Sequence, residues 1–414
     1  MADAPYVPED VFTPKTIVTR AMFERRNEPD ADGNPGVQNR LQDALRERGA
    51  QVLIFGDTGV GKSSLVKYAA EDETLFAVTV ECGSEMKYAD ILDTIVRKLV
   101  DVKATTVKRT VSAESSATGE ASVPWFTKLS GTIKGAKGKE QNYEVVEKPV
   151  LDVITEVMAT AGKSLIVLDN FQNINAQETR NLVAQLMEKL SDRAGDWDKP
   201  DIKCVVVGIA EDAASLLGGS LSFARRTVQI GVPRIPDDEI RALLSRGFGL
   251  LGLDVHPNLM KQFVFYSDGF PFFAHLIGLY VSRATMRAQT QEVHGAQLNA
   301  ALTEAAKSVS ASYERRIQTA REVGGDVQPR TQIMRILAES TDREWTSAMV
   351  QTLWEQRVDK RYDYAFMYVA LSQLSKSKFG SILARTGNPR RYRYGFADPH
   401  LRPYLRITRV AHDD

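Results

Sequence analysis

A glycine-rich stretch, GDTGVGKSS, carries the residue types that bind phosphate groups. It follows an apolar run, QVLIF (51–55), and precedes a segment with helical periodicity. Glycines let the backbone curl so that its N–H groups face phosphate oxygens, and the positive end of the next helix adds to the attraction. In this pattern the lysine reaches the β- and γ-phosphates and the next hydroxyl ligates Mg²⁺. The predicted nucleotide contacts are Gly56, Asp57, Thr58, Gly59, Val60, Gly61, Lys62, Ser63 and Ser64.

A second apolar run, LIVLD (165–169), ends in a carboxylate and is followed by Asn170. The metal beside such a loop needs a carboxylate from a neighbouring strand, so Ser63 and Asp169 are predicted to bind on the side of Mg²⁺. The alternative is that Asp169 only caps the next turn. Asn170 cannot accept a proton, although an amide can orient a water, as in some GTPases. We therefore expect slow, conditional hydrolysis of ATP involving Lys62, Asp169 and Asn170.

Composition and charge exclude several classes of protein. The chain has 414 residues, with 53 basic and 53 acidic side chains. This length predicts two or three domains, and the balance of charge excludes a chain-wide basic surface for nucleic acid but not a local patch. The two cysteines, Cys82 and Cys204, form no CxxC pattern, which argues against a zinc site. Without a signal-like start or a membrane-length apolar run, we expect a cytoplasmic protein with no membrane contact.

Short apolar runs alternate with amphipathic segments across residues 51–233. The runs lie at 51–55, 75–80, 165–169, 204–208 and 227–232. Strands that alternate with helices predict an α/β fold with a parallel sheet, which makes 51–233 a P-loop NTPase core after an N-terminal segment at 1–50. A basic insertion at 102–148 interrupts the pattern. It is predicted to be a solvated loop, a pore lining or a docking element.

The strand pattern stops after residue 233. Helical segments at 234–318 are followed by a polar linker at 319–329, and three short helices then precede a hairpin in SILARTGNPRRYRYGF. Three apolar faces are predicted in the last region, 330–414. They consist of Ile333, Ile336 and Leu337; of Trp345, Met349 and Leu353; and of Phe366, Val369 and Ala370.

Several of these motifs occur together in the order found in AAA+ ATPases. They are GDTGVGKSS, LIVLDN, GIAEDAASLL, SLSFARR and SDGFPFFAHLIG. Over about residues 15–310 the chain resembles bacterial AAA+ proteins related to origin-recognition and transposition-regulator ATPases, and to STAND signalling ATPases. The resemblance implies a helical lid at 234–318 and a winged-helix domain at 330–414. It also implies a setting such as mobile-element control or phage defence.

The resemblance assigns roles to two groups of arginines. In MFERR (22–26), Arg26 matches the arginine of a box ahead of the core. Arg225 or Arg226 stands where such proteins place an arginine that reaches a neighbouring subunit's γ-phosphate, which implies a homo-oligomer. The alternative is that both arginines simply face solvent.

The resemblance also bears on the lid and on a sensor position. In GFPFF, Pro271 matches a residue that packs near the base and ribose, whereas His275 among apolar residues is expected to be structural. A polar sensor is expected after CVVVG, yet the chain has Ile209 and Ala210. This departure, like Asn170, affects activation of water rather than phosphate binding.

Arginines alternate with tyrosines in the predicted hairpin, a combination that suits contact with a DNA backbone. They are Arg385, Arg390, Arg391 and Arg393. Contact with protein, or an inert lid, are the alternatives. The function predicted first is an oligomerising ATP-dependent switch that engages DNA or a co-encoded effector protein. The alternative is a non-hydrolysing, nucleotide-gated scaffold that binds an effector and never contacts DNA.

Overall fold

The computed structural model describes residues 6–29, 33–100, 150–160, 162–209, 221–321, 328–357, 364–388 and 391–410. Contacts divide the chain into two units, Arg25–Pro233 and Met1–Glu24 with Arg234–Asp414. The expected N-terminal segment 1–50 is therefore shared between the two units. The predicted insertion, 102–148, lies outside the described residues.

A five-stranded parallel sheet with the order β2-β3-β4-β1-β5 forms the centre of the unit Arg25–Pro233. The strands are β1 (Gln51–Phe55), β2 (Ala77–Glu81), β3 (Leu165–Asp169), β4 (Lys203–Val207) and β5 (Thr227–Gly231). β3 and β4 are buried along their whole length, which explains why the sequence shows continuous apolar runs there. The predicted α/β P-loop NTPase fold with a parallel sheet is confirmed.

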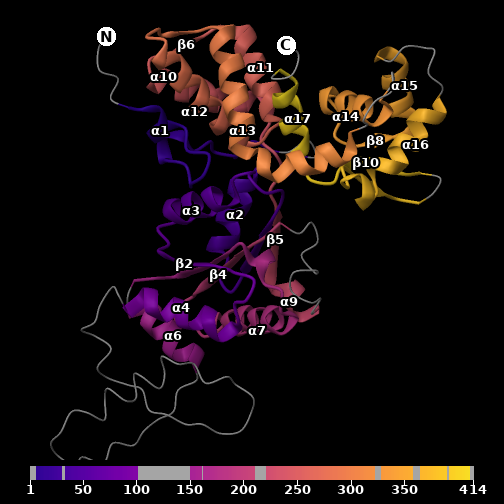
Figure 1. Ribbon diagram of the computed structural model, residues 1–414. Coiled ribbons are helices and arrows are strands. Elements are labelled where there is room, and N and C mark those ends of the chain that lie inside the picture. The colour runs from indigo at the N-terminus through magenta and orange to yellow at the C-terminus, as the bar shows by residue number, and fades with distance from the viewer. Residues whose placement is uncertain are drawn as a thin grey trace, which may run out of the picture. The chain divides into compact units, whose positions relative to one another are not determined.

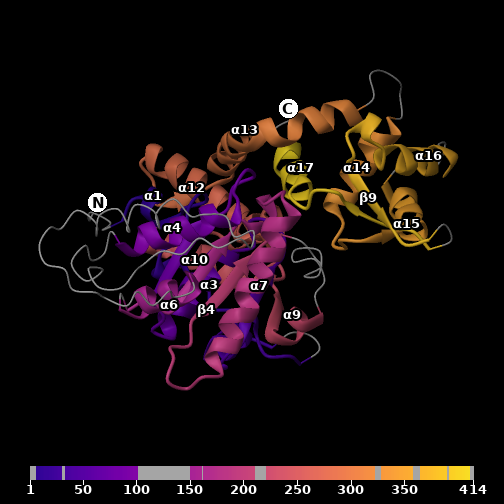
Figure 2. The same ribbon diagram turned by 90° about the horizontal axis from the view of Figure 1, so that it is seen from below.

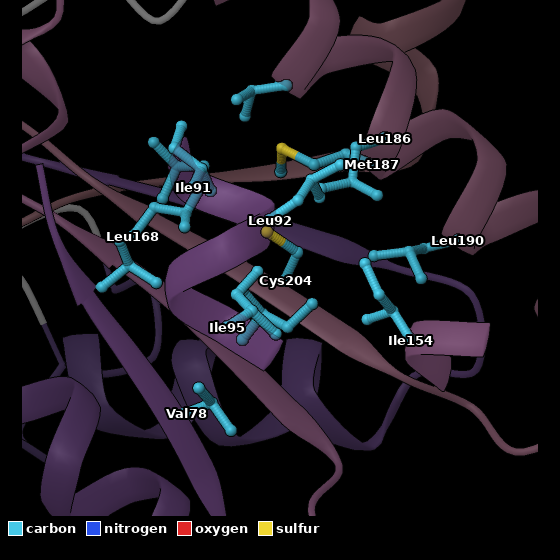
Figure 3. Close-up of a cluster of buried hydrophobic side chains, with 14 of the residues drawn as sticks. Val78, Ile91, Leu92, Ile95, Ile154, Leu168, Leu186, Met187, Leu190 and Cys204 are labelled. Carbon is cyan, nitrogen blue, oxygen red and sulfur yellow. The ribbon is translucent and has the colours of Figure 1, made fainter. Parts of the chain in front are cut away.

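Helices cover both faces of this sheet (Figure 1). One face carries α2 (Val37–Arg46) and α3 (Lys62–Asp72), and the other carries α4 (Tyr88–Val100), α6 (Val150–Thr160) and α7 (Gln177–Ala194). Figure 3 shows how Ile95 of α4 and Leu190 of α7 gather over Cys204 of β4. This close packing fixes the strands relative to one another, and it therefore fixes where their carboxyl ends lie. The remaining elements of the unit are η2 (Phe171–Asn173) and α9 (Leu221–Arg226).

The N-terminal residues complete a helical core in the other unit. There α1 (Pro8–Val11) and η1 (Arg20–Met22) join α10 (Asp237–Leu250), α11 (Pro257–Ser267), α12 (Pro271–Arg287), α13 (Gly295–Ala320) and a small ladder of β6 (Asp254–Val255) with β7 (Glu292–Val293). The ring of Phe12 is fully buried, with its centroid 5.2 Å from that of Phe248. A Cβ on Gly278 would lie 2.5 Å from this ring, so the close contact requires a glycine.

The C-terminal module comprises the described residues from 329 to 410 and is visible in Figure 2. Its elements are α14 (Pro329–Glu339), β8 (Trp345–Thr346), α15 (Ser347–Arg357), α16 (Tyr364–Leu374), η3 (Ser377–Phe379), β9 (Leu383–Thr386), β10 (Arg393–Phe396) and α17 (Leu401–Val410). β9 and β10 are antiparallel, so the predicted hairpin is confirmed. β8 adds a third strand in the order β8-β10-β9, and at two residues it was too short to predict from periodicity.

Burial confirms one predicted apolar face of the module and corrects another. Ile333, Ile336 and Leu337 of α14 are all buried. In α16, by contrast, Phe366 is 51% exposed and Val369 is 55% exposed. Of the predicted face only Ala370 is buried, and α16 buries Met367, Leu371 and Leu374 beside it. The segment YAFMYVALSQL is apolar on nearly every side, so its periodicity does not reveal which side faces the core.

Helix α15 shows a smaller correction of the same kind. Trp345 ahead of it is fully buried as expected, but Met349 is 36% exposed. Val350 and Trp354 are the residues that α15 buries.

A buried ionic cluster joins α17 to the end of α11. The Asp268 carboxylate lies 2.7 Å from the guanidinium of Arg234, 3.3 Å from that of Arg402 and 3.2 Å from that of Arg406. Burial lowers the pKa of Arg402 to about 10, although the Asp268 charge opposes this shift. Because Arg402 and Arg406 are buried, the Asp268 carboxylate is important to the balance of their charges.

No helix within the described part of the chain combines the length and the apolar character needed to cross a membrane.

Candidate functional site

The loop between β1 and α3 contains three glycines with a positive φ, Gly56, Gly59 and Gly61. Gly56 has a φ of 150°, and a Cβ there would lie 2.4 Å from the carbonyl oxygen of Val232. Gly61 has a φ of 92° and is the N-cap residue of α3. Side chains larger than hydrogen disfavour such a backbone. The glycines therefore let the chain turn sharply out of β1 and directly into the N-terminus of α3.

Lys62 is held inside this loop by backbone carbonyls. Its Nζ donates to the oxygen of Gly56 at 2.9 Å and to that of Asp57 at 2.8 Å. Burial lowers the pKa of Lys62 to about 8, while the charges of Asp169 and Asp57 act in the opposite direction. A partly desolvated ammonium that donates to two neutral carbonyls is suited to bind phosphate oxygens, which are stronger acceptors.

The two predicted metal-side residues lie in direct contact. Ser63 Oγ donates to Asp169 Oδ2 at 2.6 Å, and Asp169 is buried at the end of β3. The other carboxylate oxygen, Oδ1, accepts from the backbone N–H of Asn170 at 2.8 Å. A hydroxyl and a carboxylate at the mouth of a phosphate loop form an oxygen set that fits Mg²⁺. Their role as metal-side residues stays a prediction.

Asn170 contacts an acid that the sequence-based interpretation missed. Its backbone is left-handed, with a φ of 56°, and its Nδ2 donates to Glu81 Oε2 at 2.9 Å. Glu81 ends β2 and is the register partner of Asp169 on β3. The signal was present, because AVTVE is an apolar run that ends in a carboxylate, as LIVLD is. Strand order, which decides that the two ends are neighbours, was not available from the sequence.

One family model matches the segment that contains this site. Residues 36–195 match the family model described as an AAA ATPase domain, and this segment contains the phosphate loop, Glu81 and Asp169. The chain carries an AAA ATPase domain. No curated protein matches the sequence.

Solved structures with a similar course of the chain include three archaeal proteins. The ORC2 protein of Aeropyrum pernix is 16% identical with a TM-score of 0.48, and the match covers 94% of this chain and 97% of that chain. A Walker-type ATPase of Pyrococcus abyssi is 17% identical with a TM-score of 0.49, at 93% and 99% coverage. Cdc6p of Pyrobaculum aerophilum is 14% identical with a TM-score of 0.48, at 98% coverage of both chains.

The two candidate arginine fingers lie in different surroundings within the same unit as the AAA ATPase domain. Arg226 forms an ion pair of 2.7 Å with Asp192 on α7 and is only partly exposed. Arg225 is exposed, and no side chain among the described residues pairs with it. Arg225 is therefore the arginine that is available to a second molecule.

Other residues predicted near the nucleotide are placed as follows. Ile209 is exposed after β4, and Ala210 lies outside the described residues. Pro271 is the first residue of α12, in the unit that does not contain the AAA ATPase domain, and its contact with nucleotide stays a prediction. His275 is structural, because its Nδ1 accepts from the backbone N–H of Thr13 at 3.1 Å and burial lowers its pKa to about 4.

The hairpin of the C-terminal module presents a basic surface. Arg385 and Arg391 are exposed, and the Arg385 guanidinium lies 4.2 Å from the ring centroid of Tyr392. Arg393 is exposed and lies 3.3 Å from the carboxylate of Glu344. Arg390 lies outside the described residues.

Proposed function

We propose that the chain is an ATP-dependent switch whose AAA ATPase domain binds and hydrolyses Mg–ATP. The observation that carries the proposal is the convergence at one sheet edge of Lys62, Ser63 and Asp169. ATP phosphates would replace the carbonyls of Gly56 and Asp57 as partners of Lys62. A bound Mg²⁺ would neutralise charge that develops on the transferred phosphoryl group.

Binding is tested with a matched pair of lysines on α3. Lys62→Ala should weaken ATP affinity about 100-fold, since it removes charge-assisted contacts to phosphate. Lys67, which is exposed and lies 4.0 Å from Glu71, is the control, and Lys67→Ala should leave the affinity unchanged. Equal effects of the two changes, measured by titration with a fluorescent ATP analogue, would contradict the proposed site.

We infer that the switch works as a homo-oligomer in which Arg225 completes the site of a neighbouring copy. The exposure of Arg225 and the ion pair of Arg226 with Asp192 support this choice. An arginine of this kind can contribute about 10³-fold or more to the rate. Phosphate release per molecule should rise with protein concentration and collapse in Arg225→Ala but not in Arg226→Ala. A specific activity independent of concentration would exclude the shared site.

Slow turnover is part of the same proposal. Asn170 stands directly after the metal-side Asp169 and has no proton-accepting group. The sensor position is occupied by the exposed Ile209. Neither this position nor that of Asn170 therefore supplies a group that could take a proton from the attacking water. We expect turnover well below 1 s⁻¹, whereas kinases commonly reach ~1–100 s⁻¹.

We further propose that the C-terminal module has a winged-helix architecture and contacts the backbone of DNA in the cytoplasm. The exposed arginines of β9 and β10 and the stacking of Arg385 on Tyr392 support this role. Duplex binding should weaken steeply with salt, because phosphate contacts release counterions. The double variant Arg385→Ala with Arg391→Ala should weaken binding several-fold, while Lys261→Ala, an exposed change on α11, should not.

A second candidate function rests on the exposed apolar side of α16. Phe366 and Val369 are more than half exposed, which suits a protein partner better than a phosphate backbone. In that case the chain is a nucleotide-gated scaffold for a co-encoded effector, in a setting such as mobile-element control or phage defence. Tight ATP binding without hydrolysis, together with no affinity for duplex DNA, is the result that favours this function.

A further inference from the structure

Glu81 is a carboxylate at the carboxyl end of β2 to which the proposed function assigns no role. The ladder between β2 and β3 places it opposite Asp169. Directly after it, the backbone N–H of Cys82 donates to the Asp169 carbonyl at 2.9 Å. The ladder and this hydrogen bond therefore fix the backbone of Glu81 beside Asp169, the predicted metal-side carboxylate.

The Glu81 side chain is held by an amide whose own position is determined by the backbone. Asn170 receives one restraint from its N–H, which donates to Asp169 Oδ1 at 2.8 Å, and another from its carbonyl, which accepts from the N–H of Asn173 at 3.0 Å. Its Nδ2 then donates to Glu81 Oε2 at 2.9 Å. One oxygen of the carboxylate is thereby oriented, and the other keeps its capacity to accept a proton.

These contacts form one continuous line from the phosphate loop to Glu81. Ser63 Oγ meets Asp169 Oδ2, Asp169 Oδ1 meets the Asn170 N–H, and the Asn170 amide meets Glu81. Two other exposed acids near this edge in the sequence are Glu85 and Glu178. Neither has a hydrogen bond or ion pair to a member of this line within the described residues.

We propose that Glu81 is the general base of ATP hydrolysis in this chain and that Asn170 positions it. The inference rests on the proposed ATPase function. A water oxygen forms a bond to the γ-phosphorus while the bond from that phosphorus to the β–γ bridging oxygen breaks, and its electron pair leaves with ADP. The Glu81 carboxylate takes the proton of the attacking water and later releases it to solvent. The base thus comes from the end of the neighbouring strand β2. The position directly after Asp169 is occupied by Asn170, which cannot accept a proton.

The test is a single-turnover measurement with radiolabelled ATP, at protein concentrations high enough for the oligomer to form. Glu81→Gln keeps an oxygen that can accept from Asn170, so the local fold should persist. We expect its hydrolysis rate to fall about 100-fold or more, with ATP affinity within about twofold of wild type. The nucleotide extracted from this variant should remain ATP at times when wild type holds ADP. The matched controls Glu85→Gln and Glu178→Gln should hydrolyse at the wild-type rate.

A further readout separates a base from a merely structural carboxylate. The exchanged pair Glu81→Asn with Asn170→Glu should hydrolyse ATP faster than Glu81→Asn alone, because it restores one carboxylate and one amide.

The opposite results overturn the assignment in distinguishable ways. An unchanged rate in Glu81→Gln removes Glu81 as the base but leaves the ATPase function standing. A wild-type protein that binds ATP tightly and never converts it contradicts both.

Discussion

The carboxyl edge of the core sheet and the C-terminal module position their side chains by different physical means. At the sheet edge, Lys62 and Asn170 are held by hydrogen bonds to or from backbone groups within a few residues of the phosphate loop or of β3. In the module, α17 is anchored by side chains that meet Asp268 from distant parts of the chain. Changes at the sheet edge should therefore impair chemistry and spare the fold, whereas changes in the module should do the reverse.

The largest effect is expected at the ionic cluster. Asp268→Asn removes a buried carboxylate that pairs with Arg234, Arg402 and Arg406. It should lower the free energy of unfolding by ~3–5 kcal/mol. The exposed pair of Glu344 and Arg393 provides the control, because Glu344→Gln should cost at most ~1 kcal/mol. Chemical denaturation measures both variants, and similar losses would break the comparison.

Adjacent residues of α16 test which side of the helix carries stability. Met367 is fully buried, so Met367→Ala should cost about 3 kcal/mol. Its neighbour Phe366 is half exposed, and Phe366→Ala should cost ~0.5 kcal/mol or less. Urea midpoints compare the two directly. A larger loss at Phe366 would mean that this side of α16 is covered in the protein in solution.

His275 makes stability depend on pH in the unit that contains α12. Its folded-state pKa is about 4, below the ordinary imidazole value of 6.5, so the unfolded chain binds the proton more readily. Stability is thus fully present above pH 6.5 and is lost as the pH falls from 6.5 towards 4, by on the order of 2–3 kcal/mol. Denaturation at pH 7 and pH 4.5 should show a smaller difference for His275→Gln than for wild type. Equal differences would mean that the imidazole is accessible to water.

The smallest effect concerns the pH dependence of ATP binding. Lys62 has a pKa of about 8 in the free protein, so its ammonium loses its proton as the pH rises through 8. ATP affinity should then fall by up to about tenfold per pH unit, which corresponds to ~1.4 kcal/mol. Isothermal titration between pH 7 and pH 9.5 measures the slope. Lys62→Ala should show no such slope, and a flat wild-type profile would contradict the role of Lys62.

Contiguous patterns predicted the parts of the site that are contiguous. GDTGVGKSS identified the phosphate loop, and the continuous apolar run ahead of Asp169 identified β3 almost to the residue. Glu81 was not predicted as a site residue because it lies near Asp169 only if β2 and β3 are neighbours. Local sequence periodicity carries no information about strand order. The N-terminal residues around Phe12 escaped for a related reason, since their partners Phe248 and His275 are more than 200 residues away along the chain.

The sequence by itself determined the strands of the core sheet and the phosphate loop, because glycine conformation and strand periodicity are local properties of the chain. Only the tertiary structure decided which ends of strands meet and which side of a uniformly apolar helix is buried. These outcomes depend on packing between segments far apart in sequence. Asn170 shows the difference most clearly: its residue type excluded it as a base, but only the pairing of β2 with β3 brought a carboxylate to its amide.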